Sequence, residues 1–459
     1  MQLKRIPTPG ISHYAYLLAD EGGDALVVDP RRDVDEYLSV AASMGVRIRY
    51  VLETHRQEDF VMGSAHLAER TGARVVNGKH ELFGRGDVRL SNGETFSLGK
   101  LRIQALHTPG HTPESMSYAV YPKPGGNTAW GVFTGDALFF GDTGRTDLPD
   151  ANRSEENAAL LYDMIHQKLA PLGEGVAVLP AHGPGSVCGS GMLPLPCSTI
   201  GAERAHNPVF KLTREQFAKR KGGERMPRPP YFRHMEQVNL EGGMKPSGHP
   251  HQVELVSAGE LESALAKDMC IDTREPEGYA GGHVRNAYSI WLGGLPVFGG
   301  WVAKPDTPIH LVGERTEDVA TAYLHLSRIG IDGVRSALSG GFGAWRRSGR
   351  PLCSSGAITP RQLAERRDEV QLLDVRDADE FASGHIPEAR NLYVGYLEER
   401  SSDLGLDPDR PIVVTCGVGH RAGLGVSILR RAGYENVSNL LGGMKAWRAL
   451  ELPIQEVDR

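Results

Sequence analysis

Short apolar runs bounded by glycine, proline and polar residues recur along the whole chain and predict β-strands. Other segments, such as residues 37–44 and 422–432, carry apolar residues with the spacing of one helix face. The expected strands include residues 14–18, 25–29, 47–52, 129–134, 370–374 and 411–415. Strands that alternate with helices are typical of α/β proteins, whose loops beyond the strand ends often carry the functional residues.

The length and composition indicate a multidomain globular protein. At 459 residues the chain is too long for one hydrophobic core, and typical domain sizes suggest roughly three domains. Its hydrophobic fraction of 40%, charged fraction of 24% and net charge of −6 exclude a disordered or membrane-embedded class. Lysine and arginine are scattered, so no surface for nucleic acid is expected.

The N-terminus lacks the apolar core of a signal peptide, and no stretch approaches 18 apolar residues. We therefore expect a cytoplasmic protein without a membrane segment. The five cysteines, at positions 188, 197, 270, 353 and 416, have no CxxC spacing. This pattern predicts free thiols rather than disulfides or a structural zinc site, and Cys270, on an expected core strand, is assigned to packing.

The C-terminal part repeats itself with an offset of 102 residues, which is domain-sized and indicates a duplicated domain. The repeat rests on three pairs of landmarks: Asp-Thr-Arg at 272–274 with Asp-Val-Arg at 374–376, Gly-His at 282–283 with Gly-His at 384–385, and GGFGAWR at 340–346 with GGMKAWR at 442–448. The expected organisation is a first domain at 1–240, a linker at 241–252, a first copy at 253–350 and a second copy at 357–459.

Cys416 lies between an expected strand and an expected helix, in the loop Cys416-Gly-Val-Gly-His-Arg421. The backbone N–H groups of the next four residues, the helix dipole and the Arg421 cation all favour a thiolate at this position and could hold a persulfide. The residues expected to surround the sulfur are Gly417, Val418, Gly419 and His420.

The second copy resembles the rhodanese family through Asp-Val-Arg, Gly-His-Ile, the six-residue Cys-to-Arg loop and the closing Gly-Gly-Met-Lys-Ala-Trp. The resemblance implies that Cys416 carries sulfane sulfur and that a loop of this length serves sulfur transfer. In the first copy, Gly313 stands at the position of Cys416, and Asp318 stands at the position of Arg421. The first copy is therefore expected to be an inactive rhodanese fold.

Four polar clusters, at 54–60, 108–113, 134–136 and 180–183, mark the first 240 residues. Their order and spacing resemble the metallo-β-lactamase superfamily, in the branch of glyoxalase II and the persulfide dioxygenases. The resemblance implies an αββα sandwich with metals at one edge. The expected fold class is therefore α/β multidomain, with this sandwich followed by two rhodanese-like α/β domains that have parallel sheets.

The first cluster departs from the THxHxDH motif of most superfamily members, because Gln57 and Phe60 replace two of its histidines. The resemblance implies that His55, His111 and Asp136 remain as metal ligands, since these are the positions that ligate iron in persulfide dioxygenases. Two histidines and one carboxylate form the facial triad of non-haem Fe(II) oxygenases, which leaves positions open for O₂ and a sulfur ligand. We expect one Fe(II) per chain.

Asp59 and His182 would belong to the second metal site of the superfamily. Because that site has lost an imidazole, we expect them to contact substrate or to orient ligands. Cys188 follows His182 closely, and packing in the core is favoured over a place in the pocket.

Together the resemblances imply a persulfide dioxygenase fused to an inactive and an active rhodanese domain, acting in sulfide detoxification. The expected substrates are O₂ and a small persulfide, such as that of glutathione or coenzyme A. The products would be a free thiol and sulfite, which Cys416 would link to thiosulfate, and family resemblance suggests a homodimer. Two alternatives stay open: a glyoxalase II-like thioester hydrolase, and a sulfurtransferase with a metal-free scaffold domain.

Overall fold

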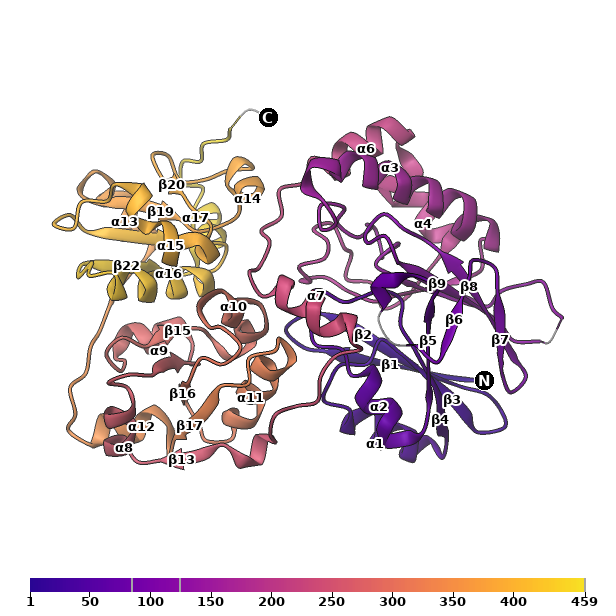
Figure 1. Cartoon of the computed structure of the whole chain (residues 1–459). Coiled ribbons are helices and arrows are strands. Elements are labelled where there is room, and N and C mark those ends of the chain that lie inside the picture. The colour runs from indigo at the N-terminus through magenta and orange to yellow at the C-terminus, as the bar shows by residue number, and fades with distance from the viewer. Residues whose placement is uncertain (84–85, 124, 458–459) are drawn as a thin grey trace. The chain divides into compact units, whose positions relative to one another are not determined.

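The computed structural model describes residues 1–83, 86–123 and 125–457, which form two compact units (Figure 1). The first unit comprises residues 1–224, 231–246 and 328–330, and the second comprises residues 225–230, 247–327 and 331–459. The last two residues of the expected second copy lie outside the described residues. Within the described residues, every helix is too short or too polar to span a bilayer.

Two six-stranded sheets form the centre of the first unit. The first sheet, in the order β1-β2-β3-β4-β5-β6, consists of β1 (Gln2–Thr8), β2 (His13–Ala19), β3 (Asp24–Val28), β4 (Arg47–Leu52), β5 (Arg74–Gly78) and β6 (Val88–Leu90). The second, in the order β12-β11-β10-β9-β8-β7, consists of β7 (Thr95–Leu98), β8 (Leu101–His107), β9 (Met116–Tyr121), β10 (Gly131–Gly135), β11 (Ala177–Pro180) and β12 (Ser198–Thr199). The helices are α1 (Asp35–Met44), α2 (Ser64–Thr71), α3 (Ser154–Met164), α4 (Ile200–His206), α5 (Pro208–Lys211), α6 (Arg214–Gly222) and α7 (Phe232–Leu240).

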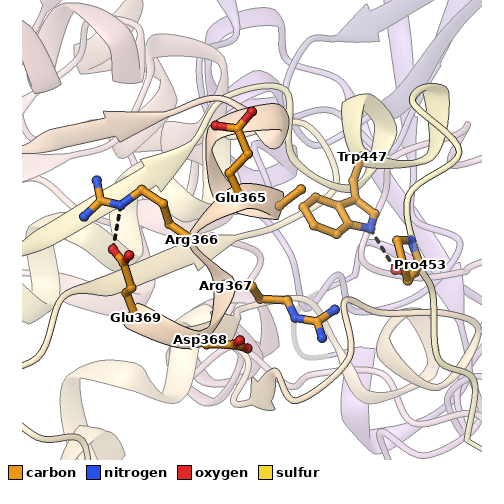
Figure 2. A pocket seen from close by; sticks show the side chains of 8 residues that line it. Glu365, Arg366, Arg367, Asp368, Glu369, Trp447 and Pro453 are labelled. Carbon is orange, nitrogen blue, oxygen red and sulfur yellow. Dashed lines mark hydrogen bonds and ion pairs between the residues drawn. The ribbon is translucent and has the colours of Figure 1, made fainter.

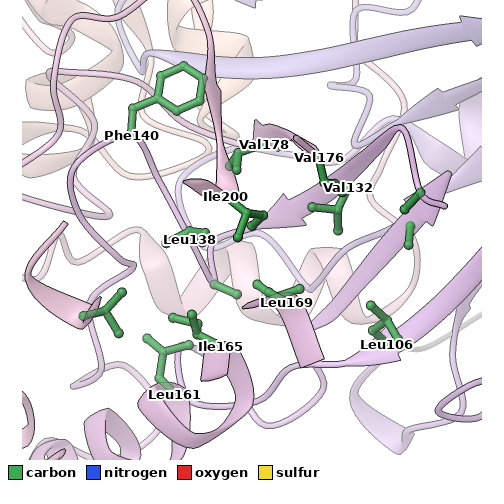
Figure 3. Close-up of a cluster of buried hydrophobic side chains, with 14 of the residues drawn as sticks. Leu106, Val132, Leu138, Phe140, Leu161, Ile165, Leu169, Val176, Val178 and Ile200 are labelled. Atoms are coloured by element: carbon green, nitrogen blue, oxygen red, sulfur yellow. The ribbon is translucent and has the colours of Figure 1, made fainter. Parts of the chain in front are cut away.

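Neighbouring residues of the central strands pack in different cores. In β2, Leu18 packs between the two sheets with Val120 and Phe133, whereas Leu17 points to the other face and packs with Tyr37 of α1. A third apolar cluster fills the space between the second sheet and α3 to α6 (Figure 3). Three buried clusters between four layers give the expected αββα sandwich.

The second unit holds two five-stranded parallel sheets with the same strand order, β13-β17-β16-β14-β15 and β18-β22-β21-β19-β20. The first copy consists of β13 (Glu254–Val256), α8 (Ala258–Ala264), β14 (Met269–Asp272), α9 (Pro276–Gly281), β15 (Tyr288–Ser289), α10 (Leu295–Val302), β16 (Ile309–Val312), α11 (Asp318–Arg328), β17 (Val334–Leu338) and α12 (Gly341–Arg347). The second consists of β18 (Gly356–Ile358), α13 (Pro360–Glu365), β19 (Gln371–Asp374), α14 (Ala378–Ala382), β20 (Arg390–Asn391), α15 (Leu397–Arg400), β21 (Ile412–Thr415), α16 (His420–Arg431), β22 (Val437–Leu440) and α17 (Gly443–Ala449).

A β-bulge keeps the two copies in register. Strand β16 begins 103 residues before the equivalent strand β21. This separation is one residue larger than the offset of 102 between the landmarks. In β17 the pairing skips Arg335, because Ile309 lies opposite Val334 and the next residue, His310, lies opposite Ser336. Strand β22 pairs with β21 without a skip. The first copy thus holds one extra residue in the bulge, which returns the last landmark to the offset of 102.

Helix α16 begins at His420, two residues before the expected start. Gly419, with a φ of 109°, ends the loop in a conformation that residues with a side chain rarely adopt, and the chain then enters the helix directly. Arg421 therefore lies in the first turn of α16.

Candidate functional site

Polar residues gather just beyond the ends of four strands of the sandwich. His55 follows β4, His111 follows β8, Asp136 follows β10 and His182 follows β11. All four are at most 1% exposed, and His182 Nε2 lies 3.6 Å from Asp136 Oδ1. The strand ends of both sheets therefore meet in one buried polar centre.

His55, His111 and Asp136 form a group whose possible ligand atoms all lie within 4.8 Å of one another. The Nε2 atoms of His55 and His111 lie 3.9 Å and 3.4 Å from Oδ2 of Asp136. Donors bound to one metal ion at about 2.1 Å would lie roughly 3 to 3.5 Å apart. The observed spacing is compatible with a shared ion after small side-chain shifts.

The contacts of both histidine rings leave Nε2 available to a cation. His111 Nδ1 lies 2.8 Å from the carbonyl oxygen of Arg145, to which it can only donate. His55 Nδ1 lies 3.0 Å from Thr54 Oγ1, whose own proton is donated to Asp29 at 2.7 Å. In the neutral His111 ring Nδ1 therefore carries the proton, and Nε2 keeps its lone pair for a ligand bond; the contact with Thr54 favours the same tautomer of His55.

Several atoms of this centre are buried without a hydrogen-bond partner among the described residues: Nε2 of His55, His111 and His182, and both carboxylate oxygens of Asp136. Unpaired buried polar atoms cost free energy, so this donor set fits a cation. Burial raises the pKa of Asp136 to about 7 and lowers the pKa of His55 well below its usual value. The carboxylates of Asp136 and Glu58 outweigh the effect of burial on His111 and raise its pKa to about 9.

Asp59, His182 and Cys188 form a second group of possible ligands within 4.8 Å of one another. His182 Nδ1 lies 3.8 Å from Asp59 Oδ2 and 3.0 Å from the hydroxyl of Ser186. Cys188 is buried among apolar side chains, as expected, and its sulfur also belongs to this polar group. Burial and the charge of Asp59 raise the pKa of its thiol well above the usual value, which favours the protonated form.

Cys416 follows β21 and is 1% exposed. The N–H of Gly419 donates to its Sγ at 3.1 Å. The start of α17 holds the loop from another side, because the N–H groups of Met444 and Lys445 donate to the carbonyls of Cys416 and Gly417 at 2.8 Å and 2.9 Å. The Cys416 loop is thus fixed both by its own turn and by a helix terminus.

Arg421 is paired with a carboxylate of the second copy. Its guanidinium donates to both oxygens of Glu380 in α14, at 2.5 Å and 2.8 Å. Although burial opposes ionisation of Glu380, the hydrogen bonds from Arg421 lower its pKa to about 2. The sequence assigned this cation to the sulfur alone, whereas in the structure its charge is shared with Glu380.

The side chain of His420 links the loop to the first copy. Its ring stacks on Trp291, with centroids 4.7 Å apart and an angle of 16° between the planes. Its Nε2 lies 2.9 Å from the carboxylate of Glu275. The copy that has Gly313 at the position of Cys416 therefore contacts the Cys416 loop.

A family model described as "Metallo-beta-lactamase superfamily" matches residues 8–182, and one described as "Rhodanese-like domain" matches residues 257–348 and 359–450. The chain belongs to the metallo-β-lactamase superfamily and carries two rhodanese-like domains. The expected fusion of these folds is thereby confirmed.

Relatives of the superfamily domain bear the names of different enzymes. The mitochondrial persulfide dioxygenase ETHE1 of Bos taurus is 26% identical over 53% of this chain and 89% of that protein. A hydroxyacylglutathione hydrolase of Anaeromyxobacter dehalogenans is 32% identical over 44% of this chain and 83% of that protein. A probable metallo-hydrolase of Burkholderia pseudomallei is 31% identical over 35% of this chain, and the match spans only 66% of that protein.

A solved structure extends the similarity beyond one domain. The crystal structure of a metallo-β-lactamase from Staphylococcus aureus has a TM-score of 0.66 and 27% identity, and the match covers 74% of this chain and 98% of that one.

The two departures from the superfamily motif have different surroundings. Phe60 is fully buried in an apolar cluster, and its ring centroid lies 4.3 Å from that of His13. An apolar contact thus replaces the last histidine of the motif. Gln57 is also fully buried, and its Nε2 lies 3.4 Å from Nδ1 of His55, on the side of the ring that faces away from the metal position.

Glu58 and His13 also lie at the buried polar centre, although the sequence did not predict this. Glu58 is 1% exposed, and its Oε2 lies 3.6 Å from Nε2 of His111. His13, at the start of β2, has its ring centroid 5.4 Å from that of His182. The motif leaves the position of Glu58 variable, and His13 is remote in sequence from all four clusters, so neither carried a local signal.

A surface pocket of about 350 Å³ in the second rhodanese-like domain contains none of the expected site residues (Figure 2). Arg366 and Glu369 pair across its lining at 2.7 Å, and Trp447 Nε1 donates to the carbonyl of Pro453 at 2.9 Å. Because none of residues 416–421 line it, the pocket is separate from the Cys416 loop.

Proposed function

We propose that the metallo-β-lactamase domain is a persulfide dioxygenase and that the second rhodanese-like domain transfers sulfur through Cys416. The observation that carries the proposal is the buried group of His55, His111 and Asp136, whose ligand atoms lack protein partners within the described residues. Its donor set is that of the non-haem Fe(II) oxygenases. Similarity to persulfide dioxygenases and the presence of rhodanese-like domains support a role in sulfur metabolism.

In the dioxygenase step, a persulfide RSSH, O₂ and water would yield the thiol RSH and sulfite. His55, His111 and Asp136 would hold one Fe(II), which when bound supplies O₂ activation and open positions for the terminal sulfur. The contacts of the two rings with Thr54 and Arg145 would keep both Nε2 atoms directed at the centre. Asp59 and His182, beside this group, would contact the substrate.

In the transfer step, the Cys416 thiolate would attack the outer sulfur of RSSH. The S–S bond of the donor breaks, the thiolate RS⁻ leaves with the bonding electron pair, and Cys416 keeps the sulfane sulfur as a persulfide. Sulfite would then attack that outer sulfur and leave as thiosulfate, which restores the Cys416 thiolate. The Gly419 N–H, directed at Sγ, would stabilise negative charge there.

Metal analysis combined with oxygen uptake tests the proposal. We expect about one iron per chain and O₂ consumption that requires glutathione persulfide or coenzyme A persulfide and releases sulfite. Iron-loaded protein that consumes no O₂ with either persulfide would contradict it. The homodimer and the cytoplasmic location stay predictions, for which mass measurement in solution and fractionation are the tests.

A second candidate is a two-metal thioester hydrolase. It is favoured by the similarity to hydroxyacylglutathione hydrolases and by the second group of possible ligands, Asp59, His182 and Cys188. Two zinc ions per chain and turnover of S-lactoylglutathione without O₂ uptake would support it. If the protein binds no metal, the remaining alternative is a sulfurtransferase whose first domain acts as a scaffold.

A further inference from the structure

A second carboxylate, that of Glu58, faces the same two imidazole nitrogens as Asp136. Its Oε2 lies 3.6 Å from Nε2 of His111 and 3.9 Å from Nε2 of His55. The corresponding distances from Oδ2 of Asp136 are 3.4 Å and 3.9 Å. Glu58 therefore lies almost as close to the two imidazole nitrogens as Asp136 does, although the group of ligand atoms within 4.8 Å of one another comprises His55, His111 and Asp136.

Glu58 Oε2 has no hydrogen-bond partner within the part of the chain that the structure describes. A carboxylate that is 1% exposed has lost its hydration and needs hydrogen bonds or a cation in exchange. Two other buried carboxylates of this domain each have one oxygen that accepts a hydrogen bond and one without a partner: Glu114 accepts the N–H of Arg56 at 3.1 Å, and Glu53 accepts the amide of Asn77 at 2.8 Å. Glu58 differs from them in the two imidazole nitrogens that lie in front of its unpartnered oxygen.

The surrounding charge also indicates a missing cation. The carboxylates of Asp136, Glu58 and Asp59 are each at most 1% exposed and share one buried region with His55 and His111. A divalent ion would balance two carboxylate charges at once.

We propose that Glu58 is a fourth ligand of the metal, which makes the donor set two histidines and two carboxylates. The inference rests on the proposed metal centre and deepens it. Four donors arranged tetrahedrally at about 2.1 Å lie roughly 3.4 Å apart, close to the spacing of Oε2 from the two Nε2 atoms. Gln57 occupies the motif position of a third histidine, so the chain replaces that neutral donor with an anionic donor one residue later.

The added carboxylate changes which ions the centre prefers. Oxygen donors suit harder ions such as Mn(II) and Fe(II), whereas a third imidazole favours zinc. Glu58 therefore directs the centre away from the zinc chemistry of the hydrolases in its superfamily. It also leaves fewer positions for exogenous ligands than three protein donors would.

Binding of Co(II) and Mn(II) to the full chain tests the assignment in Glu58→Gln and Glu58→Asp variants. Glu114→Gln is the matched control, because this neighbouring carboxylate is equally buried but binds the backbone of Arg56. We expect Glu58→Gln to weaken Co(II) binding at least about 10-fold and to change the visible Co(II) spectrum, while Glu58→Asp restores part of the affinity. Circular dichroism and thermal unfolding report whether each variant is folded.

Unchanged Co(II) affinity and spectrum in folded Glu58→Gln would overturn the assignment, as would an equal loss in Glu114→Gln. The outcome is separable from that of the proposed function. A wild-type protein that binds iron and loses it in Glu58→Gln, yet consumes no O₂ with persulfide, would keep Glu58 as a ligand and refute the dioxygenase.

Discussion

The two rhodanese-like domains share a scaffold and differ in one loop. In each, the arginine of the first landmark pairs with its aspartate at 2.6 Å and donates to the glycine carbonyl of the second landmark. In each, the histidine after that glycine stacks on an aromatic ring: His283 on Tyr279, and His385 on Phe381. These landmarks build the domain, so they are present also in the copy that has Gly313 at the position of Cys416.

The two rhodanese-like domains differ in the loops that follow β16 and β21. Asp318 ends the first loop and pairs locally with Arg315 at 3.5 Å, and Gly313 begins it. The second loop begins with Cys416 and ends with Arg421, which pairs with Glu380 of α14. The landmark residues that build the scaffold and the loop residues that differ between the copies therefore lie in separate segments of the same domain.

The largest effect is expected for Cys416→Ser, because a hydroxyl at this position cannot form a persulfide. Sulfur transfer from thiosulfate or a persulfide should fall at least about 10³-fold, while persulfide-dependent O₂ uptake continues. Cys197→Ser, at an exposed cysteine, is the control and should keep both activities. Residual transfer near the wild-type rate in Cys416→Ser would place the sulfur on another residue.

Alanine at two equivalent glycines should separate folding from activity. A Cβ on Gly443 would lie 2.3 Å from the carbonyl oxygen of Cys416, and one on Gly341 would lie 2.4 Å from that of Glu314. Both substitutions should cost about 1–3 kcal/mol in urea unfolding. Only Gly443→Ala should also lower sulfur transfer, by up to about 10²-fold, because it displaces the reactive loop. Equal activity of the two variants would show that the loop position is not critical.

A smaller effect is expected from Trp291→Ala in the first copy. Loss of the stack on His420 should reduce kcat/KM for sulfur transfer roughly 2- to 10-fold, because such ring contacts contribute about 0.5–1.5 kcal/mol. Trp301→Ala is the matched control, since Trp301 contacts Tyr393 and Tyr396 of the second copy. If both variants reduce transfer alike, the contact acts through general packing rather than through the loop.

The smallest effect concerns Glu380, whose equivalent in the first copy is Gly278. The folded state lowers the pKa of Glu380 from 4.5 to about 2, so its pair with Arg421 stabilises the fold above pH 4.5 and loses that contribution as pH falls towards 2. Because the carboxylate is 38% exposed, we expect Glu380→Gln to cost only about 0.5–1 kcal/mol at pH 7. In urea unfolding this difference should vanish near pH 2, and a difference that grows on acidification would contradict the pairing.

Sequence patterns predicted the elements that depend on local order. Residues 47–52 form β4 as expected, and His55, His111 and Asp136 meet because the strands before them end at the same edge. Contacts that depend on tertiary packing could not be predicted from the sequence. Glu380 lies 41 residues before Arg421, and Glu58 is directed inward by a loop that no periodic pattern describes.

The bulge at Arg335 has a practical consequence for protein engineering. Because it lies downstream of the loop, residues 313–318 and 416–421 are segments of six residues that each begin directly after a matching strand, although the following helix begins at Asp318 in the first copy and at His420 in the second. The six-residue segment is therefore a cassette that can be exchanged between the copies without an insertion or a deletion. On the proposed function, a chain with residues 416–421 in both places would have two sulfur-carrying sites on one polypeptide.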